Sequence, residues 1–106
     1  MSQLNQIVVR GAPISVEIDP ACHSAYVRFK QARVEKTISD ERTGGLSTID
    51  LDSKGEVIGV ELVHVKEFSI SCIRHHLPER FKRVDLDKAR FVVPNLACAN
   101  RELACA

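Results

Sequence analysis

Apolar and polar residues alternate with a period of two through the first two-thirds of the chain. The segments that show this alternation are ISVEID (14–19), AYVRF (25–29), RVEKTIS (33–39), LSTIDLD (46–52) and EVIGVELVHV (56–65). Successive side chains of a strand point to opposite faces, so each segment would have one apolar face and one polar face. The pattern predicts five strands of an antiparallel sheet that is covered on one side only.

Short connections separate these predicted strands. Residues 19–23, 30–32 and 43–45 each contain a turn-forming residue or have the length of a hairpin loop. Strands joined in this way form a meander, in which neighbours in the sequence are neighbours in the sheet. The first strand, ISVEID, has no lysine or internal proline to guard an open edge, so we expect it to be an edge strand that something covers.

Further along the chain the apolar residues follow a helical spacing. Ile70, Ile73 and Leu77 recur at intervals of three and four, and Pro78 follows them directly. This spacing predicts a helix over about residues 67–77 that the proline ends. A sheet with one apolar face needs a second layer, and we expect this helix to pack on that face.

The chain is expected to form one α+β domain, an antiparallel five-stranded β-meander with one helix packed on one face. Its 106 residues suit a single domain, and an apolar content of 44% is typical of a globular protein. The domain is predicted to span residues 14–93, with an extra short C-terminal strand near residues 89–93. Residues 1–13 form an N-terminal segment in which QIVVR is a candidate edge strand, and residues 94–106 form a tail.

The N-terminal residues and the cysteines indicate the compartment. The chain starts without the basic and apolar run of a signal peptide, and it contains no apolar stretch of roughly 20 residues. We therefore expect a cytoplasmic protein that does not enter a membrane. Cys22, Cys72, Cys98 and Cys105 show no CxxC spacing, so we expect free thiols in that compartment.

The stretch DLDSKGEVIGVE (50–61) resembles a calcium-binding loop. The residues at the first, third, sixth and twelfth positions of an EF-hand are Asp50, Asp52, Gly55 and Glu61. However, both flanks alternate with a period of two, and Lys54 would put a cation at a ligand position. We therefore interpret the stretch as a hairpin turn, with Gly55 supplying a positive φ, and expect no calcium binding.

Two longer stretches carry a resemblance to a known family. DPACHSAYVRF (19–29) and GLSTIDLDSKGEVIGVEL (45–62) resemble the paired hairpins of a small bacterial family, domain of unknown function 2283. The resemblance covers about residues 14–65 and departs from the family pattern at residues 22–25 and at Lys54. It implies a small sheet-rich fold without an assigned activity. Some members of the family are encoded next to small toxin-like genes, so the resemblance also implies antitoxin-like partner binding.

Cysteine and histidine side chains offer the best candidates for chemistry. In SCIRHHLPER, Cys72 and His76 would lie one helical turn apart, with His64 just upstream, which is half of a zinc site. The other half would come from Cys22 and His23 or from the last two cysteines, but no spacing supports both halves. We favour a small buried cysteine with histidines facing solvent at a helix C-terminus, and predict no metal, cofactor or catalytic residue.

A basic segment raises the alternative of nucleic-acid binding. Residues 66–106 carry eight Lys and Arg against five Asp and Glu, a net charge of +3, whereas residues 1–65 carry seven against nine, a net charge of −2. Arg80, Lys82 and Arg83 are the candidate phosphate contacts. The chain has a single tyrosine and no tryptophan, too few aromatic rings for a base-stacking platform, so we do not expect nucleic acid to be the partner.

The favoured hypothesis is a small protein-interaction module without enzymatic activity. It is expected to self-associate, as a homodimer, because small sheets have open edges that a second chain can cover. The candidate interaction surface is either a sheet edge or the polar face that carries Tyr26 and Arg28, two residue types enriched at interfaces. A nucleic-acid-binding protein and a Cys/His metal-site protein are the alternatives.

Overall fold

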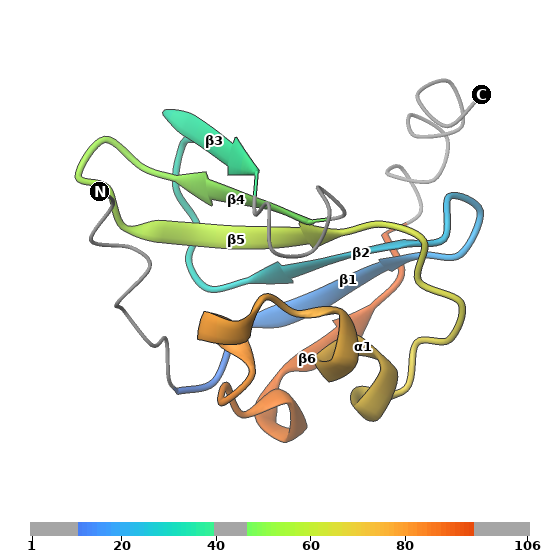
Figure 1. Ribbon diagram of the computed structural model, residues 1–106. Coiled ribbons are helices and arrows are strands. Elements are labelled where there is room, and N and C mark those ends of the chain that lie inside the picture. Colours follow the sequence, from blue (N-terminus) through green and yellow to red (C-terminus); the bar gives the residue numbers. More distant parts are fainter. Residues whose placement is uncertain (1–10, 40–46, 95–106) are drawn as a thin grey trace.

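The computed structural model describes residues 11–39 and 47–94, which form an α+β fold with one mixed six-stranded sheet (Figure 1). The strands are β1 (Ser15–Asp19), β2 (Ser24–Arg28), β3 (Lys36–Ser39), β4 (Ser47–Leu51), β5 (Val57–Leu62) and β6 (Arg90–Val92). One α-helix, α1 (Ile70–His76), and two 3-10 helices, η3 (Glu79–Phe81) and η4 (Leu86–Lys88), lie between β5 and β6. The predicted α+β class is confirmed, and so is the short C-terminal strand.

The order of the strands corrects two predictions. The order across the sheet is β3-β4-β5-β2-β1-β6, so the predicted five-stranded antiparallel meander is wrong. Strand β2 pairs antiparallel with β5, which leaves β3 at the far edge, and β6 pairs parallel with β1. Strand β1, the predicted edge, therefore lies inside the sheet. The chain itself covers this unguarded strand, because its last strand returns alongside β1 after the helical segment.

The remaining predictions about the ends of the chain lie mostly outside the described residues. The candidate edge strand QIVVR falls within residues 1–10, and nearly all of the tail falls within residues 95–106. The domain that the structure describes begins at Gly11 and ends at Pro94.

Alternation along the strands produces one continuous apolar row across the sheet. The residues paired in register from β3 to β6 are Ile38, Ile49, Val60, Val27, Val16 and Phe91. The four central members of this row are almost completely buried. Burying a side chain of this size contributes roughly 1.5–3 kcal/mol, so the row is a main source of stability.

The helix is shorter than predicted because a serine caps it. The hydroxyl of Ser69 accepts a hydrogen bond from the backbone N–H of Cys72 at 3.3 Å, which starts α1 at Ile70 rather than near residue 67. The helix ends at His76, and its C-cap residue, Leu77, lies just before Pro78. Within the described part of the chain, no helix is long and apolar enough to cross a membrane.

Two turns of 3-10 helix complete the layer that covers the sheet (Figure 1). They contribute buried Phe81 and Leu86 to the same core as Ile73 of α1. The Phe81 ring lies 5.7 Å, centroid to centroid, from that of Phe29, which follows β2. The pattern of apolar residues did not predict these two turns, because a three-residue helix is too short to show a period.

We predict that Ile73→Asp strongly destabilises the protein. Ile73 is completely buried under the sheet, so the substitution would bury an unpaired carboxylate at a cost of several kcal/mol, close to the whole stability of a small domain. Thermal denaturation followed by circular dichroism measures the loss. The matched control is Ile70→Asp, one turn earlier and 37% exposed, which should change the melting temperature little. Equal effects in both variants would contradict the packing of α1.

Candidate functional site

Polar side chains form a hydrogen-bonded network on the sheet face opposite the core. The Tyr26 hydroxyl donates to Oδ2 of Asp50 at 2.8 Å, and the Thr37 hydroxyl donates to Oδ1 of the same carboxylate at 2.6 Å. On the other side of Tyr26, Arg28 donates from Nε and Nη2 to the two oxygens of Glu17 at 2.6 and 3.2 Å. The guanidinium carbon of Arg28 lies 4.8 Å from the centroid of the Tyr26 ring. The network thus joins β3, β4, β2 and β1.

The two residues of the predicted interaction surface, Tyr26 and Arg28, are the centre of this network. Tyr26 is only 8% exposed, and its burial, followed by its hydrogen bond to Asp50, raises the pKa of the phenol well above its ordinary value. The hydrogen bond to Glu17 raises the pKa of Arg28. Tyr26 therefore remains a proton donor at any physiological pH. The Arg28 and Glu17 side chains are 23% and 24% exposed, so solvent reaches both members of this ion pair.

The position of the Tyr26 ring depends on a glycine. Tyr26 pairs directly with Glu61, but its ring lies diagonally over Gly59 of β5 to reach Asp50 on β4. A Cβ atom on Gly59 would lie 2.3 Å from Cε2 of the ring, closer than atoms can approach. The alternation of apolar and polar residues did not predict a role for Gly59. The available signal was a glycine inside a strand, which often marks a place where another group approaches the backbone.

We predict that Gly59→Ala destabilises the protein by about 1–3 kcal/mol, because the added methyl group must displace the Tyr26 ring. Urea denaturation measures the change in the free energy of unfolding. In a Tyr26→Ala background the same substitution should cost clearly less, since the ring is gone. A cost that is the same in both backgrounds would show that the ring is not the cause.

The β4–β5 connection is a tight turn that Asp52 organises. Oδ1 of Asp52 accepts the backbone N–H groups of Lys54 and Glu56, both at 2.9 Å, and Gly55 has a φ of +81°. Lys30 places its ammonium 2.6 Å from Oδ2 of Asp52 and 2.8 Å from Glu56. The strand flanks and the positive φ confirm the hairpin interpretation of the EF-hand-like stretch. Asp52 forms an ion pair with Lys30. The absence of calcium binding stays a prediction.

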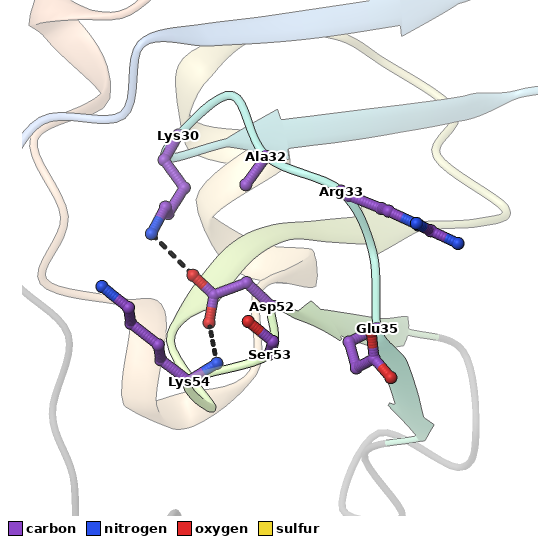
Figure 2. A pocket seen from close by; sticks show the side chains of 7 residues that line it. All are labelled: Lys30, Ala32, Arg33, Glu35, Asp52, Ser53 and Lys54. Atoms are coloured by element: carbon purple, nitrogen blue, oxygen red, sulfur yellow. Dashed lines mark hydrogen bonds and ion pairs between the residues drawn. The ribbon is translucent and has the colours of Figure 1, made fainter.

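A pocket of about 350 Å³ lies between this hairpin and the connection from β2 to β3 (Figure 2). The residues that line it are Lys30, Ala32, Arg33, Glu35, Asp52, Ser53 and Lys54. Figure 2 shows the Lys30–Asp52 pair on one side of the pocket and Arg33 directed away from that pair. The pocket therefore adjoins the start of β3, the edge strand.

The ion pair between Lys30 and Asp52 changes the pKa of the Asp52 carboxyl, and this change can be measured. The hydrogen bond from Lys30, followed by that from the Glu56 N–H, lowers the pKa of Asp52 from 3.8 to about 2. Because the folded-state pKa is the lower one, the pair stabilises the fold above about pH 4, and this contribution is lost as the pH falls toward 2. We expect Lys30→Met to raise the pKa of Asp52 toward its ordinary value.

Carboxyl-carbon chemical shifts recorded across a pH titration measure that pKa. Lys54→Met is the control, because Lys54 contacts Asp52 through its backbone N–H and not through its ammonium. An Asp52 pKa that moves equally in the two variants would show that general charge, rather than the Lys30 contact, lowers it.

Part of the basic segment has a structural role. Arg74 donates from Nη1 to the carbonyl oxygens of Lys82 and Val84 at 2.7 and 2.8 Å. In return, the Lys82 ammonium donates to the carbonyl oxygen of His75 at 3.0 Å, at the C-terminus of α1. These contacts fasten the helix to the segment between η3 and η4. Of the three candidate phosphate contacts, Lys82 is thus engaged with the backbone, while Arg83 is exposed and Arg80 is partly exposed.

The structure brings together only two of the three candidate metal ligands. Sγ of Cys72 lies 3.8 Å from Nδ1 of His76, but that nitrogen also lies 2.9 Å from the Cys72 carbonyl oxygen and is therefore its hydrogen-bond donor. His64 lines a different pocket, beside Cys22 and His23. In the described ranges, no group of three or more Cys, His, Asp or Glu residues is arranged to hold a metal ion.

The prediction of free thiols is only partly correct. Cys72 is free, whereas Cys22 is disulfide-bonded. The other two cysteines, Cys98 and Cys105, fall outside the described residues. Spacing along the sequence could not show the Cys22 disulfide, because a disulfide depends on where the fold places two distant cysteines.

Comparison with family models, curated proteins and solved structures found no match to the chain. The resemblance to domain of unknown function 2283 therefore stays a hypothesis.

Proposed function

We propose that this protein is a non-enzymatic interaction module that self-associates by pairing the β3 strands of two copies. The observation that carries the proposal is the open edge of the sheet at β3. This strand pairs with β4 on one side, and no described strand pairs with its other side. Alternate residues of β3 therefore direct backbone N–H and C=O groups away from the sheet, where another strand can bind them.

Strand β6, at the opposite edge of the sheet, is less suited than β3 to pairing with another chain. Strand β6 has three residues, and Pro94 follows shortly after it. A proline has no N–H to donate to a neighbouring strand, so it limits the length over which β6 could pair with another chain. Val34, just before β3, is 45% exposed. The β3 edge thus offers a longer backbone and an apolar contact.

The charges of β3 fit a symmetrical pairing with a second copy. An antiparallel pair centred on Thr37 places Lys36 opposite Ile38 of the other copy, and Glu35 opposite Ser39. No like charges are then directly opposite each other, which favours this register over one centred on Lys36. Ile38 packs at the margin of the core, and in this register the aliphatic part of Lys36 from the other copy would lie against it.

The pocket beside β3 supports the same surface. A strand that pairs with β3 runs directly past the cavity shown in Figure 2. Among the described residues, the Arg33 guanidinium and the Lys54 ammonium form no ion pair, so both remain available to a neighbouring chain. The resemblance to domain of unknown function 2283 is a further proposal that agrees with partner binding, since it implies no catalytic activity.

We predict that Thr37→Lys converts a dimer into a monomer. The substitution places two lysines opposite each other on the symmetry axis, and the shift should be at least about tenfold in the dissociation constant, or about 1.4 kcal/mol. Sedimentation equilibrium at micromolar concentrations measures the mass. Thr48→Lys is the control, because it adds the same charge on the same face of the neighbouring strand β4.

Two outcomes would overturn the proposal. One is a wild-type mass of a single chain, about 11.8 kDa, that does not change between micromolar and millimolar concentrations. The other is a stable dimer that Thr37→Lys and Thr48→Lys leave equally intact, which would locate the interface away from β3.

A further inference from the structure

Two histidines share an unusual backbone conformation at one end of the sheet. His23 has a φ of +53° and ends the β1–β2 turn, and His64 has a φ of +59° and follows β5. They are the only residues other than glycine with a positive φ in the part of the chain that the structure describes. Residues with a side chain adopt this conformation at an energetic cost, and such residues concentrate at functional sites. The pair therefore identifies a place to search for a ligand.

A backbone hydrogen bond ties the two histidine loops together. The N–H of Val65, next to His64, donates to the carbonyl oxygen of His23 at 2.8 Å. Figure 1 shows the β1–β2 turn and the chain leaving β5 side by side at this end of the sheet. The two imidazoles are thus carried by loops of fixed separation, which is the usual way in which a protein prepares a site before its ligand arrives.

The two histidines line one pocket of about 450 Å³. The other residues that line it are Ala21, Cys22 and Lys66. No carboxylate is among them. Within the described residues, neither imidazole nor the Lys66 ammonium has an ion-pair partner. The pocket thus combines one permanent positive charge with two groups that become positive when they take up a proton.

This set of groups fits an anion better than a metal ion. A metal site needs at least three good ligands, and the third candidate, the sulfur of Cys22, is in a disulfide. The Lys66 ammonium would also repel a divalent cation in the same pocket. By contrast, an ammonium and two imidazoles are hydrogen-bond donors of the kind that bind the oxygens of a phosphate group.

We propose that His23, His64 and Lys66 form a binding site for a phosphate-type oxyanion, either free phosphate or a phosphate monoester. The site lies on the β1–β2 turn and on the loop after β5, whereas the proposed interface lies on β3, so either can be wrong without the other. Asp19, which is 4% exposed, accepts the N–H of Cys22 at 3.3 Å in the β1–β2 turn. It does not line the pocket.

The test is a titration of the full chain with inorganic phosphate, followed by NMR of the histidine ring protons. The rings of His23 and His64 should shift with a saturable curve, while His75 on α1 serves as the internal control. Phenyl phosphate in a parallel arm shows whether the site takes a monoester as well as the free ion.

Three variants locate the site. His23→Asn and His64→Asn remove one imidazole each, and asparagine is the residue that best tolerates a positive φ apart from glycine, so the loops should keep their shape. Each of these variants, and Lys66→Gln, should weaken phosphate binding roughly tenfold, the loss expected for one hydrogen bond to a charged group. His75→Asn should leave the affinity unchanged.

Several results would overturn the proposal. Equal shifts of His75 and the two pocket histidines would show general ionic effects, and sodium chloride at matched ionic strength checks for these directly. If Lys66→Gln bound phosphate with wild-type affinity, Lys66 would not supply the positive charge that the proposed site requires. Saturable binding of zinc chloride, with no response to phosphate, would show that the two histidines form a metal site instead.

Discussion

The register of the sheet is the constraint on which the rest of the structure depends. Apolar side chains from all six strands stand in one row, and α1 with the two 3-10 turns covers that row from one side. Because side chains alternate between faces, a slip of one residue in any strand would turn its apolar side chains to the polar face. The same register aligns Tyr26 with Gly59 and Asp50. The core thus fixes the geometry of a network that it does not contact.

Local patterns predicted the elements well and their arrangement poorly. The period of two identified the first five strands, and Ile73 and Leu77 identified the helix, because each pattern depends only on neighbours in the sequence. The order of the strands depends on which distant segment covers which edge. Strand β6 covers β1, and β2 pairs with β5 across more than thirty residues of chain, which no local period encodes.

The same distinction applies to the candidate sites. Alternation placed Tyr26 and Arg28 on the polar face correctly, but their partners Asp50 and Glu17 belong to other strands. The partner of Asp52, Lys30, is likewise distant in the sequence. A sequence shows which face a side chain lies on, while the fold decides which group it meets there. Gly59 illustrates the limit, because its importance appears only once the Tyr26 ring lies over it.

In the EF-hand-like stretch, the fold and not the spacing of the acidic residues determines which groups their carboxylates bind. In a calcium loop the carboxylates converge on one ion. Here Asp50 points into the polar network, where it accepts from Tyr26 and Thr37, and Asp52 accepts the turn N–H groups and the Lys30 ammonium. Their charges are therefore satisfied separately by protein donors.

This internal satisfaction also bears on where a partner would bind. A chain that docked on the polar face would have to compete with the hydrogen bonds between Arg28 and Glu17 and between Tyr26 and Asp50, and breaking a buried one costs about 1–3 kcal/mol. Among the described residues, no strand pairs with the outward side of β3, so a chain that docks there breaks no described strand pairing. The hydrogen-bonded face therefore supports the sheet, and the edge next to it is where we propose that another chain binds.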